Sequence, residues 1–266
     1  AEPRQLGFGQ LDILALEGAL TGSPPPVVLL RRDDARECLF AVTRNKEIAA
    51  WGDLAAGASK LRFILPPADS GSAGTFRYLR QIDPDGIGRA PAPTNAPTTD
   101  DAIRQALSAD DTVTLFVQVP DPDNARFKLV GELGGHFVPV IDRAILRPQV
   151  AGEKIYFAEE TQVANASWSK TGTKVTTACT PLTLFTGAPE RVTGDKARAD
   201  HADLIATVKA LPAEALLPAE NTLSRLVRRT KELSAASAEQ LLKYSEEARE
   251  KAKPYWERAK EASEKA

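Results

Sequence analysis

The chain has 266 residues, which is enough for one large domain or for two lobes of ordinary size. Its formal net charge is −2, so no overall basic field favours nucleic acid or an anionic membrane as a partner. No apolar run approaches the roughly 20 residues that a membrane span needs, so the sequence predicts no such span.

The sequence offers little for metal or nucleophilic chemistry. Its two cysteines, Cys38 and Cys179, lack the CxxC spacing of metal sites, and its two histidines, His136 and His201, lie in no metal-ligand motif. GxSxG, Walker and GxGxxG motifs are absent from it. We therefore expect no metal, no cofactor and no catalytic residue. An enzyme is the less favoured class, because catalysis needs convergent titratable groups.

The N-terminal part of the chain predicts short strands. Apolar or β-rich runs predict strands over Gln10–Leu16, Val27–Leu30 and Glu37–Arg44. A short helical turn is expected over Ile48–Leu54. The start, Ala1-Glu2-Pro3, suits a mature end left when a signal peptide is cleaved after small residues.

The central stretch, Leu61–Leu79, predicts a buried strand, a tight polar turn and a helix. The apolar segment 61–65 ends at Pro66 and Pro67, and the turn Asp69–Thr75 that follows is small and hydroxyl-rich. The plain interpretation is an N-cap with glycines for turn geometry. The functional interpretation is a binding site, because the free N–H groups and the positive end of the helix dipole suit an anion or a carbonyl oxygen.

Strands and helices then alternate as far as residue 188. We expect a loop over Asp83–Thr99 and helices over Asp100–Ser108 and Ala125–Leu133. Strands are expected over Val113–Val119 and Phe137–Ile141. Residues 152–188 are β-rich. This alternation favours an α/β chain with a largely parallel sheet. The last part predicts three helices, over Asp200–Leu211, Glu220–Leu233 and Ala238–Ala262.

Several short motifs occur in a defined order along the chain. Gly9–Ile13 is similar to a G-x-x-D-I step, Ile48–Leu54 to an I-x-x-x-x-D-L segment, and Ser70–Ser72 with Thr75 to an S-G-(S/T) turn. Leu39–Thr43 is similar to a strand that crosses between lobes. Ala102–Leu107 with Val113–Gln118 is similar to the helix and strand before a second ligand loop, and Phe137–Ile141 to a V-P-(V/I) return strand. In this order, over about residues 6–190, the chain resembles the type II periplasmic solute-binding proteins, in the branches related to phosphonate-binding, thiamine-precursor-binding and TAXI-type receptors.

The resemblance implies an α/β, two-lobed, type II periplasmic-binding-protein-like fold with mostly parallel sheets and added C-terminal helices. Lobe one would comprise residues 1–44 and 137–195, lobe two residues 45–136, and the helical extension residues 196–266. The first lobe looks incomplete at its N-terminal side, since only about eight residues precede the G-x-x-D-I step where the family usually has two further strands. The implied function is extracytoplasmic capture of a small organic solute between the lobes, for delivery to a membrane transporter.

The ligand-binding residues implied by fold position lie at strand ends and loops between the lobes. Ser70, Gly71, Ser72 and Thr75 would hold a polar group of the ligand at the turn. Asp12 either faces the cleft or caps the next element.

Two further candidates follow the strand that ends near residue 119. Gln118 lies at the end of an apolar strand and either binds the ligand or satisfies loop backbone groups. Asp121 is a candidate ligand residue too, although its position beside prolines favours an Asx turn.

The sequence leaves two other matters open. The C-terminal helices favour an interaction protein as an alternative, and a carrier of lipid or another apolar ligand lies between the classes. Cys38 and Cys179 both lie in β-rich segments at the implied lobe junction, where pairing would let an exported chain form a disulfide unless the two side chains point to opposite faces.

Overall fold

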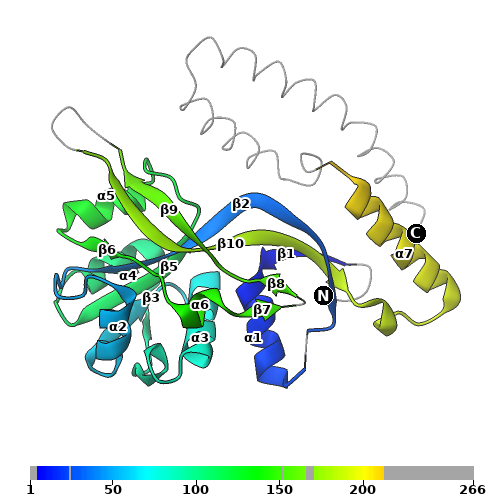
Figure 1. The fold of residues 1–266 in the computed structure, drawn as a ribbon, viewed down its shortest axis with the longest axis horizontal. Helices are drawn as coiled ribbons and strands as arrows, with labels where there is room; N and C mark the ends of the chain where they lie inside the picture. The colour runs from blue at the N-terminus through cyan, green and yellow to red at the C-terminus, as the bar shows by residue number, and fades with distance from the viewer. Residues whose placement is uncertain (1–4, 24, 151, 166–170, 213–266) are drawn as a thin grey trace, which may run out of the picture. The chain divides into compact units, whose positions relative to one another are not determined.

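The computed structural model describes residues 5–23, 25–150, 152–165 and 171–212. The chain divides into two compact units, Ala1–His201 and Ala202–Ala266, and the first holds the sheet (Figure 1). Two of the predicted C-terminal helices, Glu220–Leu233 and Ala238–Ala262, fall outside the described residues. In the part of the chain that is described, no helix is long and apolar enough to cross a membrane.

The fold is mixed α/β around a curled sheet. The sheet order is β1 (Leu6–Gln10), β10 (Thr173–Gly187), β2 (Val27–Thr43), β5 (Thr112–Gln118), β3 (Arg62–Leu65) and β4 (Thr94–Asn95). Off this path, β6 (His136–Val138) pairs with β2, and β9 (Phe157–Ala164) pairs with β10. A separate ribbon joins β7 (Gln149–Val150) to β8 (Glu153–Lys154). Figure 1 shows β2 and β10 as long, curved neighbours through the middle of the first unit.

The helices connect these strands. They are α1 (Leu11–Thr21), α2 (Trp51–Gly57), α3 (Gly71–Ile82), α4 (Thr99–Ala106), α5 (Ala125–Glu132), α6 (Arg143–Leu146) and α7 (Asp195–Ala210). Short 3-10 turns occur at Ala58–Lys60, Ile87–Arg89 and Pro189–Arg191. The predicted helices of the middle region and the predicted helix near residue 200 correspond to α2, α3, α4, α5 and α7, with ends shifted by a few residues.

The prediction of mostly parallel strands is wrong for the described sheet. Only β3 pairs in parallel, with β4 and with β5, whereas the ladders formed by β1, β2, β6, β9 and β10 are antiparallel. Alternation of strands and helices in the sequence does not determine whether two paired strands are parallel, because it does not say in which direction a distant strand joins the sheet. Here β10 comes back in the opposite direction along Val27–Cys38, the first part of β2.

The predicted strand Gln10–Leu16 is also wrong, because β1 ends at Gln10 and α1 begins at Leu11. A short apolar run suits a buried strand or a buried helix equally well. Leu11 and Leu14, three residues apart, are both buried, as expected for one face of a helix.

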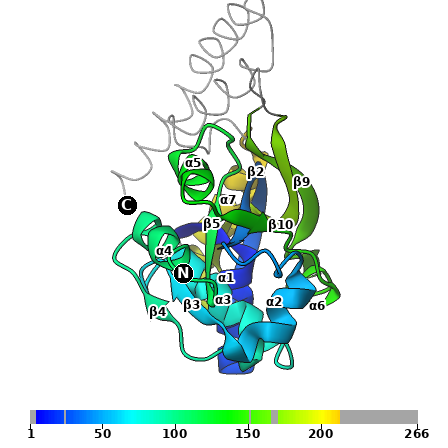
Figure 2. The same cartoon turned by 90° about the vertical axis from the view of Figure 1, so that its left-hand side faces the viewer.

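Strand β2 divides the core because alternate side chains point to opposite faces. Leu39 and Ala41 belong to the cluster that includes buried side chains of α1, α2 and α3. Phe40 and Val42 belong to the cluster that includes side chains of α4 and α5. Both faces of this strand are therefore covered, and Figure 2 shows the helices around it. Four aromatic rings, those of Phe40, Phe116, Phe127 and Phe137, pack within the second cluster with centroids 4.8–5.7 Å apart.

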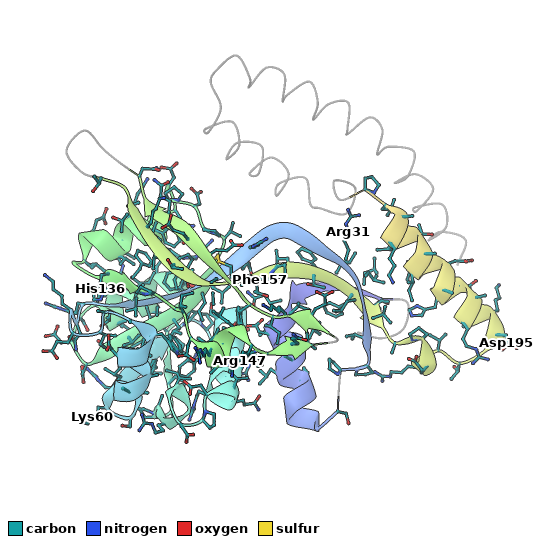
Figure 3. All side chains as sticks on the ribbon, viewed as in Figure 1. Arg31, Lys60, His136, Arg147, Phe157 and Asp195 are labelled. Atoms are coloured by element: carbon teal, nitrogen blue, oxygen red, sulfur yellow. A yellow bond between two sulfur atoms is a disulfide. The ribbon has the colours of Figure 1, made fainter. Side chains whose placement is uncertain are left out.

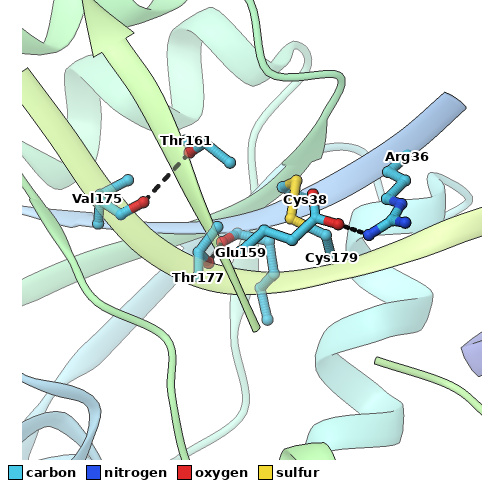
Figure 4. Close-up of a disulfide and its surroundings, with 8 residues drawn as sticks. Arg36, Cys38, Glu159, Thr161, Val175, Thr177 and Cys179 are labelled. Carbon is cyan, nitrogen blue, oxygen red and sulfur yellow. Dashed lines mark hydrogen bonds and ion pairs between the residues drawn. A yellow bond between two sulfur atoms is a disulfide. The ribbon is translucent and has the colours of Figure 1, made fainter. Parts of the chain in front are cut away.

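A disulfide joins Cys38 of β2 to Cys179 of β10 (Figure 4). The two residues are directly opposite each other in the ladder, so their side chains leave the same face of the sheet. Both are fully buried in the second core cluster. Of the two arrangements that the sequence left open, the structure shows the one in which the segments pair and the sulfurs are bonded.

Candidate functional site

The N-terminal turns of α1 and α3 pack against each other. Gly74 in the first turns of α3 faces Ile13 of α1, and a β-carbon on Gly74 would lie 2.6 Å from Ile13 Cδ1. Only glycine permits this approach without a shift of the neighbouring side chain. Ser70 caps α3, because its Oγ accepts a hydrogen bond from the Ala73 N–H at 3.2 Å. The helix start predicted at this turn is therefore confirmed, together with its serine cap.

Asp12 lies at the centre of this contact and is fully buried. Its carboxylate accepts hydrogen bonds from Thr75 Oγ1 at 2.5 Å, from the Tyr156 hydroxyl at 2.7 Å and from the Ile13 N–H at 2.9 Å. Burial raises the pKa of Asp12 above its ordinary value, although these hydrogen bonds act in the opposite direction. Asp12 thus joins the start of α1, the first turns of α3 and the segment before β9.

Two tyrosines surround this carboxylate. The rings of Tyr78 and Tyr156 lie 6.4 Å apart, centre to centre. Burial, followed by the nearby charge of Asp12, raises the pKa of both phenols. Both therefore stay neutral at physiological pH, and Tyr156 acts as a hydrogen-bond donor to Asp12.

Gln10 connects the other end of this contact to β2. Its Nε2 donates to Glu37 Oε2 at 2.5 Å, and burial raises the pKa of Glu37. Gln10 is 6% exposed, and its Oε1 has no hydrogen-bond partner. That oxygen lies 3.4 Å from the position that a β-carbon would take on Gly71, the first residue of α3. An unpaired acceptor therefore faces the N-terminus of α3.

The start of α3 supplies donors at the same place. A helix cannot satisfy its first N–H groups internally. The groups of Ala73 and Gly74 bond to Ser70, whereas those of Gly71 and Ser72 have no acceptor among the described residues. The Ser72 hydroxyl accepts from the Val117 N–H of β5 at 3.0 Å, so its hydrogen is still available.

The structure brings together most of the residues predicted to bind a ligand. Those around the start of α3 form one group: Asp12, Ser70, Gly71, Ser72 and Thr75. Asp12 bonds directly to Thr75, Ser72 reaches β5, and Ser70 caps the helix. The hydroxyls of Ser70, Ser72 and Thr75 each have one protein partner, so the structure shows a structural role for them. Their binding role stays a prediction.

Gln118 and Asp121 make contacts of their own. Gln118 Oε1 accepts a hydrogen bond from Arg126 at 2.6 Å, and Arg126 also bonds Asp100 at 2.8 Å. Asp121 accepts from the Asp123 N–H at 3.0 Å, which is the Asx geometry weighed as its alternative. Among the described contacts, neither side chain bonds to the group around Asp12.

Sequence reasoning missed Gln10, Glu37 and Tyr156 as members of this site. Gln10 and Glu37 carry a weak signal, since each is a polar residue at an end of an apolar strand. Tyr156 carries none, because it lies 144 residues from its partner Asp12 in the sequence.

The described residues hold one group with metal-ligand atoms close together, Cys38, Glu159 and Cys179. The two sulfurs are bonded to each other, so they offer no thiolate, and Glu159 forms an ion pair with Arg36 (Figure 4). This donor set does not suit a metal ion. His136 is labelled in Figure 3, and its Nε2 lies 3.0 Å from the Ile48 carbonyl oxygen, so this histidine serves the backbone.

Comparison with known proteins adds little to this picture. No family model matches the chain, and no curated protein matches it. Among solved structures, it is similar to one described as the crystal structure of a possible phosphate binding protein from Planctomyces limnophilus DSM 3776. The identity is 10%, the match covers 73% of this chain and 76% of that chain, and the TM-score is 0.32. At that TM-score, the likeness carries no argument.

Proposed function

We propose that this chain is an extracytoplasmic solute-binding protein. It captures a small organic molecule at the start of α3 and delivers it to a membrane transporter, without catalysing a reaction. In this proposal, lobe one comprises residues 1–44 and 137–195, lobe two residues 45–136, and a helical extension residues 196–266. The long strands β2 and β10 connect the lobes.

One observation carries the proposal. At the start of α3, the N–H groups of Gly71 and Ser72 and the Gln10 Oε1 atom lack partners among the described residues, although Gln10 is more than nine-tenths buried. A buried acceptor left unpaired costs about 1–3 kcal/mol, so such a group calls for a partner. A bound polar group supplies that partner.

The rigid surroundings support the same proposal. The contact between Gly74 and Ile13 and the hydrogen bonds of Asp12 fix the two helix starts relative to each other. A site whose donors are held in place loses less entropy when a ligand binds. The disulfide supports the extracytoplasmic location, because disulfides persist mainly in oxidising compartments.

The predicted alternative, an interaction protein, is favoured by a different observation. Leu6 and Phe8 are each 47% exposed on β1, which lies at an edge of the sheet. Exposed apolar side chains on an edge strand suit pairing with another chain.

Two measurements test the proposed function. Native mass spectrometry of the purified full chain looks for a co-purified small molecule. A thermal-shift screen with sugars, polyols, amino acids, amides, carboxylates and phosphonates looks for stabilisation of the folded chain. A ligand at a concentration of 100 times its Kd adds about 2.7 kcal/mol to the free energy of unfolding. A bound molecule or a saturable shift supports the proposal. Absence of both, together with concentration-dependent association that a Phe8→Ser variant abolishes, would favour the interaction protein.

A further inference from the structure

The side-chain amide of Gln10 has a fixed orientation. Where Glu37 is ionised, its carboxylate only accepts hydrogen bonds, so the contact then requires the amide nitrogen of Gln10 on that side. The amide oxygen therefore points away from Glu37 and toward Gly71. Glu37 thus decides which end of the amide faces the start of α3.

The start of α3 consequently presents both kinds of hydrogen-bonding group. Gln10 Oε1 is an acceptor, and the N–H groups of Gly71 and Ser72 are donors. A bare helix N-terminus offers donors alone and suits an anion. Here, an anion without a hydrogen leaves Gln10 Oε1 unpaired and places two acceptors against each other.

The charges nearby agree with this reasoning. The carboxyl groups of Asp12 and Glu37 lie close enough that Asp12 contributes to the raised pKa of Glu37. The described contacts of these two acids include no basic group. The basic side chain of Arg77 is exposed, and its Nη2 lies 3.8 Å from the β-carbon position of Gly74, one turn into α3. The surroundings of Gln10 itself therefore do not favour added negative charge.

We propose that the Gln10–Glu37 pair makes the start of α3 selective for a neutral group that donates and accepts hydrogen bonds, a hydroxyl or a primary carboxamide, over an ionised oxyanion. This inference rests on the proposed function and names the ligand class of that site. The ligand oxygen accepts from the N–H groups of Gly71 and Ser72. The hydroxyl O–H, or an N–H group of the carboxamide, donates to Gln10 Oε1.

The test is a titration followed by NMR of the backbone N–H groups of Gly71 and Ser72 in the full chain at pH 7.5. The probes are acetamide, glycerol, acetate and inorganic phosphate, which are small enough to report on the local site alone. We expect saturable shifts of both N–H signals with acetamide or glycerol, with a Kd at least fivefold below that of acetate or phosphate. Equal or tighter binding of an anion overturns the inference, and so does the absence of any shift, which would leave water as the partner of Gln10.

Variants separate selectivity from folding. Gln10→Met keeps the length of the side chain and removes its acceptor, so acetamide should bind at least fivefold more weakly. Glu37→Gln lets the Gln10 amide turn, so the preference for acetamide over acetate should fall toward one. Gln162→Met, at an exposed glutamine on β9, is the matched control and should change neither value. An unchanged preference in both site variants overturns the inference.

The two proposals fail in different ways. If the solute screen and mass spectrometry find a ligand while the anionic probes bind the start of α3 best, solute binding stands and the selectivity inference is wrong. If no solute binds in any assay, the proposed function is wrong as well.

Discussion

The hydrogen bond from Tyr156 to Asp12 can be removed by a single atom change, Tyr156→Phe. The bond is 2.7 Å long and its acceptor is fully buried. A hydrogen bond to a charged group contributes about 1.5–3 kcal/mol, and one to a neutral group about 0.5–1.5 kcal/mol. We therefore expect the variant to lose about 1.5–3 kcal/mol of unfolding free energy where Asp12 is ionised.

The loss should depend on pH with a defined sign. Burial raises the folded-state pKa of Asp12, so the folded chain binds this proton more tightly than the unfolded chain. The stabilisation from this proton is fully present below the ordinary aspartate pKa and is lost as pH rises through the raised value. Removal of the Tyr156 donor raises that pKa further, so the difference between wild type and variant should shrink as the pH falls.

Urea unfolding at pH 7.5 and at pH 4.5 measures both effects. Tyr78→Phe is the matched control, because Tyr78 is a buried neighbour that is not among the described hydrogen-bond donors to Asp12. The reasoning is refuted if the control loses as much stability as Tyr156→Phe, or if the difference grows in acid. Equal slopes of the unfolding lines would show that the denatured states remain comparable.

Two further predictions concern the fold itself. Gly74→Ala should destabilise by about 1–3 kcal/mol through the clash with Ile13, whereas Gly131→Ala, with open space at its β-carbon position in α5, should be neutral or stabilising by up to about 1 kcal/mol; thermal melts of the pair would expose an error if both behave alike. Replacing Cys38 and Cys179 together with alanine should lower the unfolding free energy by about 2–5 kcal/mol, because the bridge closes a loop with a sequence separation of 141 residues; denaturant unfolding with an unchanged midpoint would contradict this.

The sequence predicted the local features of the site better than its surroundings. The turn before α3 is specified by residues close together in the sequence. Two prolines end the strand, and Ser70 accepts a hydrogen bond from the N–H group three residues later. Because these signals are local, the predicted strand, cap and helix are all confirmed. The pairing of Cys38 with Cys179 was predictable only as a possibility, since it depends on which faces two distant strands present.

The rest depended on contacts that the sequence does not encode locally. The segment after Gln10 is helical because α3 and the core cover its apolar side chains, and a short apolar run alone does not reveal that. Tyr156 reaches Asp12 through the return of the chain before β9, and the direction of β10 follows from the same return. No periodicity of two or 3.6 residues reports on such long-range geometry.

The central claim is that a solute binds at the free N–H groups of α3, and one measurement tests it most directly. Proline at the first position of a helix removes an N–H group but preserves the helix, and the extended backbone of Ser70 suits a following proline. Calorimetric titration of the solute identified by the screen should therefore show about 2- to 13-fold weaker binding to Gly71→Pro, or up to about 160-fold weaker if the ligand group is charged. Thr99→Pro, the same change at the first position of α4, should bind like wild type. Wild-type affinity in a folded Gly71→Pro protein would contradict the claim.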